Sequence, residues 1–168
     1  MNFNESDLEA AIIEKFKQKK YEYGNDQDPW FIERELSDFV NKDLLFKQLK
    51  SINPNISVNL IEDAIYSILN INNTNLFERN RIFHKYLPEG VTVETGNDES
   101  NPTIKLIDFE KVENNLFEVA NQIKFNEKGQ TRIPDVLIYI NGLPLVAFEL
   151  KSPEYSKYCL KLAVFSKK

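Results

Sequence analysis

The sequence predicts an α+β domain in which helices come first and a mixed or antiparallel β-sheet follows. Helical periodicity of apolar residues is confined to the first half of the chain, and strand-like apolar runs dominate the second half. Helices that precede strands, and do not alternate with them, are typical of α+β architecture. The 168 residues are enough for one domain with a sizeable core, which we place at residues 1–153 before a divergent tail at 154–168.

The first predicted helix covers residues 6–23. Ser6 stands three residues before Glu9, which is the spacing of a capping box. Apolar residues, among them Ile12 and Phe16, repeat on one face of this helix. Further helices are expected at residues 31–35, 38–50 and 57–70, and residues 77–86 are expected to form another helix or an irregular segment.

Strands are expected at residues 91–94, 104–109, 116–125, 136–140 and 145–150. The last two contain continuous apolar runs, so both faces of each strand should be covered. The dipeptide Asn141-Gly142 between them suits a tight turn, because Gly adopts positive φ angles without steric cost. These two strands therefore form an antiparallel hairpin. Polar turns are expected at residues 25–28, 96–102 and 126–130.

Three ionisable residues, Asp135, Glu149 and Lys151, lie at the ends of this apolar hairpin. Glu149 and Lys151 are two residues apart, so their side chains point to the same face of the strand. A two-residue loop would place Asp135 on the opposite face, whereas a three-residue loop or a β-bulge would place it on the face of Glu149. We predict a three-residue loop, Ile140-Asn141-Gly142, because Gly142 suits its left-handed position.

Two carboxylates on one face suit a hard divalent cation. Mg²⁺ is favoured because it takes oxygen ligands and usually keeps waters and a phosphate in its shell. Lys151 beside such a cation could orient a water molecule or stabilise charge that develops on a phosphate. The alternative is purely structural: Glu149 and Lys151 form a salt bridge at the strand end, and Asp135 caps a turn. The short pattern alone is compatible with both interpretations.

The wider sequence resembles a known family. The spacing P-D-x13-E-x-K is similar to the PD-(D/E)xK nuclease motif, and the segment NGLPLVAFELKSP at residues 141–153 is more specific than that motif. Together they resemble the N-terminal nuclease domain of the type I restriction enzyme motor subunit. The resemblance is weak from about Leu8 and strong from Leu106 to Pro153. It implies a restriction endonuclease-like mixed sheet flanked by helices.

The resemblance also implies roles for individual residues. Asp135, Glu149 and Lys151 match the catalytic positions of the family, the first two as metal ligands, and Arg132 matches a basic residue that could contact DNA. The implied activity is Mg²⁺-dependent cleavage of double-stranded DNA within a larger translocating complex. The implied partners are modification and specificity subunits and a helicase motor that is normally in the same chain.

Charge and composition limit what this chain should do alone. The sequence holds no G-x-x-x-x-G-K-[ST] motif, so we expect the ATP-driven motor to lie elsewhere. The net charge of −5 disfavours a strong electrostatic grip on DNA. The single Cys159 excludes a disulfide framework, and no apolar run is long enough for a membrane span. We therefore expect a cytoplasmic location.

The tail and three smaller features leave alternatives open. Residues 154–168 lack the Gln of the helix that follows in the family, so the fold should be incomplete at its C-terminus, and a catalytically inactive assembly module is the alternative function. Acids of the first helix reach the metal site in related nucleases, but we expect solvent exposure for Glu9 and Glu14. The sole histidine has no partners in the sequence for a zinc or a Ser-His-Asp site. A solvated helix face or a DNA contact would explain the basic cluster Arg79, Arg81, His84 and Lys85.

Overall fold

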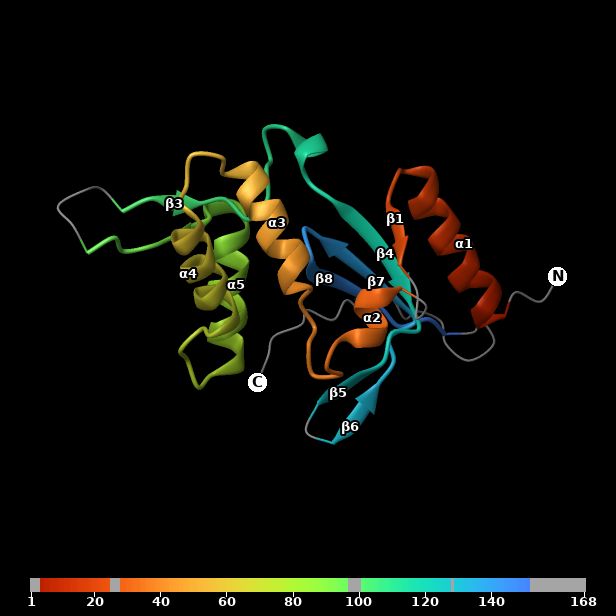
Figure 1. Cartoon of the computed structure of the whole chain (residues 1–168). Helices are drawn as coiled ribbons and strands as arrows, with labels where there is room; N and C mark the ends of the chain where they lie inside the picture. Colours follow the sequence, from red (N-terminus) through yellow and green to blue (C-terminus); the bar gives the residue numbers. More distant parts are fainter. Residues whose placement is uncertain (1–3, 25–27, 97–100, 128, 152–168) are drawn as a thin grey trace. The chain divides into compact units, whose positions relative to one another are not determined.

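A computed structural model of the chain describes residues 4–24, 28–96, 101–127 and 129–151 (Figure 1). The helices are α1 (Glu5–Gln18), α2 (Pro29–Glu33), α3 (Lys42–Ile52), α4 (Val58–Leu69), α5 (Leu76–Glu89) and the 3-10 helix η1 (Val112–Asn114). The strands are β1 (Glu22–Gly24), β2 (Val91–Thr92), β3 (Thr103–Ile104), β4 (Phe117–Asn121), β5 (Phe125–Glu127), β6 (Gln130–Arg132), β7 (Val136–Ile140) and β8 (Leu143–Phe148). This composition confirms the α+β class. The tail at 154–168 and parts of the predicted turns at 25–28 and 96–102 lie outside the described residues.

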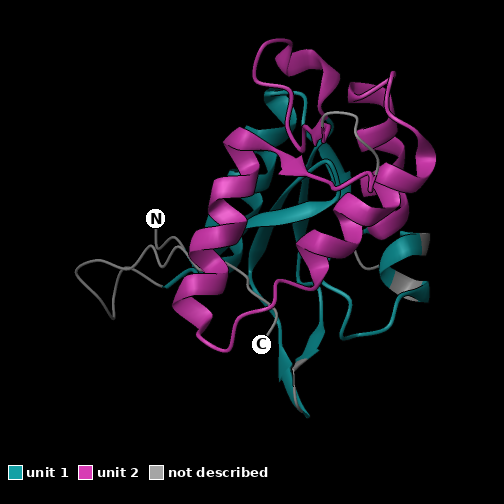
Figure 2. Ribbon diagram, turned by 90° about the vertical axis from the view of Figure 1, so that its left-hand side faces the viewer, with its two compact units in different colours: residues 1–41, 116–164 teal, residues 42–115, 165–168 magenta. Residues whose placement is uncertain are grey.

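The chain divides into two compact units, which are coloured separately in Figure 2. Among the described residues, unit 1 comprises 4–41 and 116–151, and unit 2 comprises 42–115. The predicted nuclease motif lies wholly in unit 1. The boundary of a single domain at residue 153 stays a prediction.

Unit 1 is built on a four-stranded sheet with the order β1-β4-β7-β8. The pairs β4–β7 and β7–β8 are antiparallel, whereas β1 pairs parallel with β4, so the sheet is mixed. The central strand β7 is buried at every position from Val136 to Tyr139. This burial confirms that both faces of the strand are covered.

Helix α1 covers one face of this sheet. Its Ile13 packs in one apolar cluster with Val119 of β4 and with Val136 and Ile138 of β7. Figure 1 shows α1 lying alongside β1 and β4. The apolar stripe that predicted an amphipathic helix is therefore the stripe that binds the sheet.

Both predicted ends of this helix need correction. The capping box is not at residues 6–9 but earlier, where Asn4 and Asp7 each accept a hydrogen bond from the other's backbone N–H. Asn caps a helix as well as Ser does, so a helix start at Asn4 is as favourable as one at Ser6. The helix also stops before residue 23, because Lys20 adopts a φ of 67° and the chain turns into β1 at residues 22–24.

Helix α2 packs against the opposite face. Side chains alternate along β7, so Tyr139 points away from the α1 cluster that contains Ile138. Trp30 and Phe31 of α2 each contact the Tyr139 ring at a centroid distance of 6.1 Å. A Cβ atom on Gly24 would lie 2.8 Å from the Phe31 ring. Glycine at the end of β1 thus allows the close approach of α2.

The strand predicted at residues 116–125 is interrupted. β4 ends at Asn121, because Gln122 adopts a φ of 55°, and the chain then forms a separate two-stranded hairpin of β5 and β6. Phe125 at the start of β5 is fully buried and stacks on Phe39 with ring centroids 4.5 Å apart. Because of this interruption, β4 ends beside the predicted site. Phe125 instead anchors the β5–β6 hairpin through its contact with Phe39.

Unit 2 confirms the helices predicted at 38–50, 57–70 and 77–86, which form α3, α4 and α5 with ends shifted by a few residues. Helix α4 contacts α3 and β2. The side chain of buried Asn53, in the break between α3 and α4, donates to the carbonyl oxygen of Leu49 and exchanges hydrogen bonds with the backbone of Lys105. The predicted strand at 104–109 is limited to Thr103–Ile104. None of the described helices has both the length and the apolar character needed to cross a membrane.

Candidate active site

The β7–β8 hairpin sets the geometry of the predicted site. Ile140 pairs with Leu143, so the loop contains two residues, Asn141 with a φ of 54° and Gly142 with a φ of 81°. The prediction of a three-residue loop is therefore wrong. Two successive left-handed residues form the tight turn whose twist matches the flanking strands, and this keeps Ile140 in β7.

A β-bulge supplies the change of register that the longer loop was expected to supply. The pairing shifts by one between Ile138 and Tyr139, because Leu145 is an extra residue in β8. Carried one step beyond the last pair of the two strands, the register places Asp135 opposite Glu149. Residues directly opposite in an antiparallel pair project from the same face. The two carboxylates of the predicted site therefore lie on one face.

Burial alternates along the chain beyond the end of β8. Glu149 is exposed, Leu150 is buried and Lys151 is exposed, so the alternation of an extended strand continues. Asp135 is half-buried, and its Oδ2 accepts a hydrogen bond of 2.5 Å from the backbone N–H of Leu150. This bond fixes the Asp135 carboxylate across the hairpin, on the same face as Glu149 and Lys151.

The structural alternative required an ion pair between Glu149 and Lys151. Among the described residues, the salt bridges do not include one between these two side chains. Asp135 does not cap a local turn either, since its partner Leu150 is 15 residues away in sequence. The side chains of Glu149 and Lys151 are both exposed among the described residues.

A polar network at the end of β4 adjoins Asp135. The backbone N–H of Gln122 donates to the carbonyl oxygen of Asp135 at 3.3 Å. Glu9 of α1 accepts a hydrogen bond from the side-chain amide of Asn121 at 2.6 Å and another from Gln122 at 2.8 Å. The Tyr23 hydroxyl of β1 donates to the Asn121 oxygen at 2.8 Å. The Glu9 carboxylate thus connects α1 to Gln122, whose backbone N–H donates to the Asp135 carbonyl oxygen.

The expectation that Glu9 is solvent-exposed is wrong. Glu9 is half-buried, whereas Glu14, five residues further along the helix, is exposed and among the described residues accepts a hydrogen bond from Gln18 at 3.4 Å. The polar pair Asn121-Gln122, at and directly after the end of β4, was the available signal. Asn121 is half-buried, so its side-chain amide requires an acceptor.

Arg132 lies apart from this network, on the β5–β6 hairpin. Its side chain is exposed and its Nη2 donates to the Gln130 oxygen at 3.3 Å. An exposed arginine held by a neutral neighbour keeps its full positive charge for another partner. The predicted DNA contact at Arg132 is compatible with this position and stays a prediction.

A second acidic group lies on the same sheet. Glu118 of β4 pairs in register with Glu22 of β1 and with Tyr139 of β7. Burial raises the pKa of Glu118 to about 7, and repulsion from Glu22 and Asp28 adds to the rise. Burial also raises the pKa of Tyr139, partly offset by the attraction of Arg34. In the folded chain, a proton on Glu118 is therefore favoured up to neutral pH.

The described residues contain no set of three His, Cys, Asp or Glu side chains that converge as metal ligands. The pair Asp135 and Glu149 nevertheless fits Mg²⁺, which is often bound through one or two carboxylates and keeps waters and phosphate oxygens as its other ligands. The donor atoms are oxygens, and the hairpin register places them on one face. The chemistry of the donors thus matches a hard cation and not zinc.

The basic cluster predicted on α5 is largely neutralised. Arg81 Nε lies 2.9 Å from Glu78 Oε2, and Lys85 Nζ lies 3.5 Å from Glu89 Oε2. These pairs are exposed, as on a solvated helix face. Among the described residues, Arg79 has no such ion pair with an acid. The cluster is therefore not a continuous basic patch.

The chain matches known proteins over most of its length. Residues 2–161 match the family described as the type I restriction enzyme R protein N terminus. The chain is 36% identical over 155 residues to a putative type I restriction enzyme MjaIXP endonuclease subunit of Methanocaldococcus jannaschii, and 35% identical over 158 residues to the type I restriction enzyme HindI endonuclease subunit of Haemophilus influenzae. These matches cover 88% and 89% of this chain, which spans about 15% of the length of each relative.

Proposed function

This chain belongs to the family of type I restriction enzyme R proteins, whose N-terminal part it matches, and on that premise we propose that it is a Mg²⁺-dependent endonuclease domain acting on double-stranded DNA. The observation that carries the proposal is the register of the β7–β8 hairpin, in which Asp135 stands opposite Glu149 and Lys151 follows on the same face. Two acids and a lysine on one face can hold a metal ion and stabilise charge on a phosphate, which metal-assisted phosphodiester hydrolysis requires.

Each of the three residues has a distinct task. Asp135 and Glu149 would hold the cation through their carboxylate oxygens, and Mg²⁺ there would supply neutralisation of phosphate charge and a more acidic water molecule. Lys151 orients the attacking water and stabilises negative charge as the new P–O bond forms and the ester P–O bond breaks. The attacking water gives up a proton to solvent as it bonds to phosphorus, and the leaving sugar oxygen takes up a proton from solvent.

Glu9 acts through other residues as a positioning group. Its carboxylate holds the amide of Gln122, whose backbone N–H contacts the Asp135 carbonyl. Since α1 and β4 are far apart in sequence, this link fixes the start of β7 relative to the helix. We therefore assign to Glu9 the orientation of Asp135.

The domain works within a larger complex. Its net charge of −5 gives weak nonspecific attraction for phosphate, so DNA must be delivered by other parts of the assembly. Modification and specificity subunits, and a helicase motor in the same polypeptide, would supply recognition and translocation. We propose that the complex works in the cytoplasm.

The proposal is tested by following the nicking of supercoiled plasmid at low salt with millimolar Mg²⁺ over hours. We expect slow nicking by the wild-type chain and none by Lys151→Ala, because Lys151 contributes to the transition state. Lys15→Ala is the matched control, since it removes an exposed lysine of α1 in the same unit. Equal nicking by wild type and Lys151→Ala would contradict the role of Lys151. A wild-type chain without any activity would favour an assembly module.

A further inference from the structure

The β5–β6 hairpin of unit 1 has one strand that is anchored to the rest of the unit. On β5, the Phe125 ring is fully buried, and the Arg34 guanidinium lies over it at 4.5 Å from the ring centroid. Arg34 also donates a hydrogen bond to the carbonyl oxygen of Lys124. The Asn126 N–H donates to the carbonyl oxygen of Leu36 at 2.8 Å. These contacts hold β5 on the segment that follows α2.

The other strand, β6, is exposed at all three of its positions, Gln130, Thr131 and Arg132. The three side chains supply an amide, a hydroxyl and a guanidinium, which protein–DNA interfaces use for hydrogen bonds. Oδ1 of Asn126 closes the hairpin turn by accepting from the Gly129 N–H at 2.9 Å. Figure 1 shows the hairpin extending away from the four-stranded sheet. The anchored strand therefore presents a polar partner strand to solvent.

The hairpin is locally basic in an acidic chain. Residues 124–132 include three basic residues and one acidic residue, whereas the whole chain has 21 basic and 26 acidic residues. The side chains of Lys124 and Arg132 are both exposed. A local excess of positive charge attracts the phosphate backbone of DNA, although the net charge of the chain opposes it.

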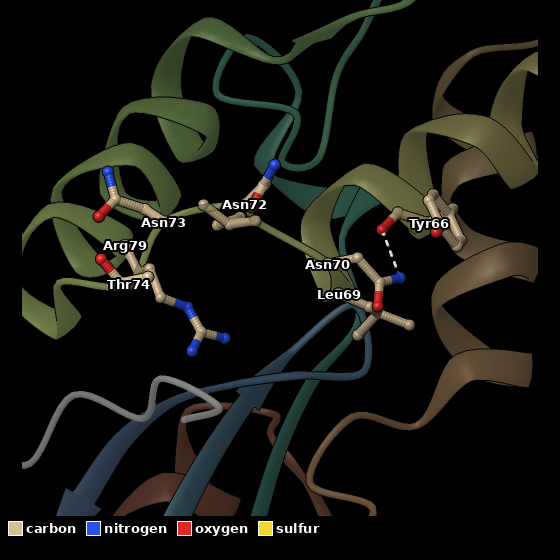
Figure 3. Close-up of a pocket in the computed structure, with 8 residues that line it drawn as sticks. Tyr66, Leu69, Asn70, Asn72, Asn73, Thr74 and Arg79 are labelled. Atoms are coloured by element: carbon tan, nitrogen blue, oxygen red, sulfur yellow. Dashed lines mark hydrogen bonds between the residues drawn. The ribbon is translucent and has the colours of Figure 1, made fainter.

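The four arginines of the chain differ in what surrounds them. Arg34 holds β5, and Arg81 lies 2.9 Å from Glu78. Arg79 is half-buried at an open pocket of unit 2, which Figure 3 shows. Arg132 is exposed, and its side chain donates to a neutral amide oxygen. Arg132 is therefore exposed and, among the described residues, not neutralised by an acid.

The position of β6 relates the hairpin to the proposed nuclease site. Arg132 precedes Asp135 by three residues, so their Cα atoms are at most about 11 Å apart. Along the axis of a duplex each strand has one phosphate about every 3.4 Å, so this span corresponds to about three base pairs. A ribbon whose two strands are about 4.8 Å apart fits the major groove, which is about 12 Å wide, but is too broad for the minor groove of about 6 Å.

We propose that the β5–β6 hairpin binds in the major groove of duplex DNA, with Arg132 on a backbone phosphate close to the phosphate that is cleaved. The proposal rests on the proposed function for the identity of the ligand, but it concerns binding and needs neither metal nor cleavage. The hairpin fixes the position of the duplex relative to Asp135, because β6 leads directly to that residue.

The test is fluorescence anisotropy with a short labelled duplex, at low salt and in EDTA so that no cleavage occurs. Arg132→Gln should weaken binding about tenfold and reduce the salt slope by about 0.9. Arg132→Lys keeps the charge and should retain the wild-type salt slope. The control Arg81→Gln makes the same charge change at an arginine that Glu78 already neutralises, and it should bind like wild type. Equal affinities of Arg132→Gln and Arg81→Gln, or no duplex binding by the wild-type chain, would overturn the proposal.

The groove is tested by competition on a duplex that contains an A·T run. Methyl green, which occupies the major groove, should displace the chain from the duplex, and netropsin, which occupies the minor groove, should not. The opposite result would overturn the assignment to the major groove. Thr131→Ala removes a neutral group, so it should weaken binding less than Arg132→Gln does and leave the salt slope unchanged.

The outcomes separate this proposal from the proposed function. If Arg132→Gln binds the duplex normally while plasmid nicking still requires Lys151, the role of the hairpin is wrong and the nuclease function stands. If Arg132→Gln loses duplex binding in EDTA although the wild-type chain does not nick, the hairpin proposal is supported and the nuclease proposal fails alone.

Discussion

Replacing Glu118 with Gln should stabilise unit 1 at alkaline pH and leave its stability unchanged below about pH 4. The variant removes a carboxyl group whose pKa is raised to about 7 by burial and by repulsion from Glu22 and Asp28. In the folded chain this group keeps its proton between pH 4.5 and about 7, whereas in the unfolded chain it loses the proton near pH 4.5. The wild-type chain therefore loses stability as pH rises through that window.

The size of the effect follows from the pKa values. A rise from 4.5 to about 7 corresponds to about 3 kcal/mol at 1.36 kcal/mol for each pH unit, and the remaining solvent contact of Glu118 makes this an upper limit. Glu118→Gln should therefore exceed wild type by at most about 3 kcal/mol in free energy of unfolding at pH 8. Glu22→Gln removes part of the repulsion and should give a smaller gain of the same sign.

Denaturant unfolding at a series of pH values measures this difference. Trp30 is the single tryptophan and packs on Tyr139 in unit 1, so its fluorescence reports the unfolding of that unit. Glu33→Gln, which removes an exposed carboxylate of α2, is the matched control and should follow wild type at all pH values. A constant difference between Glu118→Gln and wild type from pH 4 to 8 would refute the reasoning, because it would show that the proton on Glu118 is not linked to folding.

Two further predictions concern the polar contacts around the site. Glu9→Ala should lower the free energy of unfolding by about 2 kcal/mol, because the amides of Asn121 and Gln122 lose their acceptor, and should also weaken Mn²⁺ binding. Glu14→Ala on the same helix should change neither quantity. Asn141→Ala should lower the free energy of unfolding, measured with denaturant, by about 2 kcal/mol. The substitution places alanine in a left-handed conformation and removes the acceptor of the Leu116 N–H. Asn141→Gly should cost less, and equal losses in the two variants would argue against strain.

The sequence predicted those parts of the fold that depend on long apolar patterns. The helices of unit 2 and the strands β7 and β8 carry such patterns and form close to the expected positions. Strand β1 was missed because it has three residues, two of them exposed, and is defined by pairing with β4 and not by its own periodicity. The break at Gln122 was missed because a non-glycine residue adopts a positive φ there.

The site was predictable in composition but not in its supporting structure. The spacing of Asp135, Glu149 and Lys151 is local and could be recognised directly. Their common face depends on a β-bulge at the extra residue Leu145, which nothing in the sequence marks. We had instead predicted a longer loop to give the same change of register. Glu9 was assigned to solvent because its partners are more than a hundred residues away in sequence, and only the tertiary contact between α1 and β4 reveals it.

Binding of Mn²⁺ followed by electron paramagnetic resonance tests the central claim most directly, because it does not depend on the delivery of DNA. The wild-type chain should bind Mn²⁺, an oxygen-liganded ion like Mg²⁺. Asp135→Asn should lose this binding although its amide oxygen can still accept from the Leu150 N–H, and Lys151→Ala should keep it, since Lys151 is not a ligand. Undiminished Mn²⁺ binding by Asp135→Asn, or none by the wild type, would contradict the assignment of Asp135 and Glu149 as the metal site.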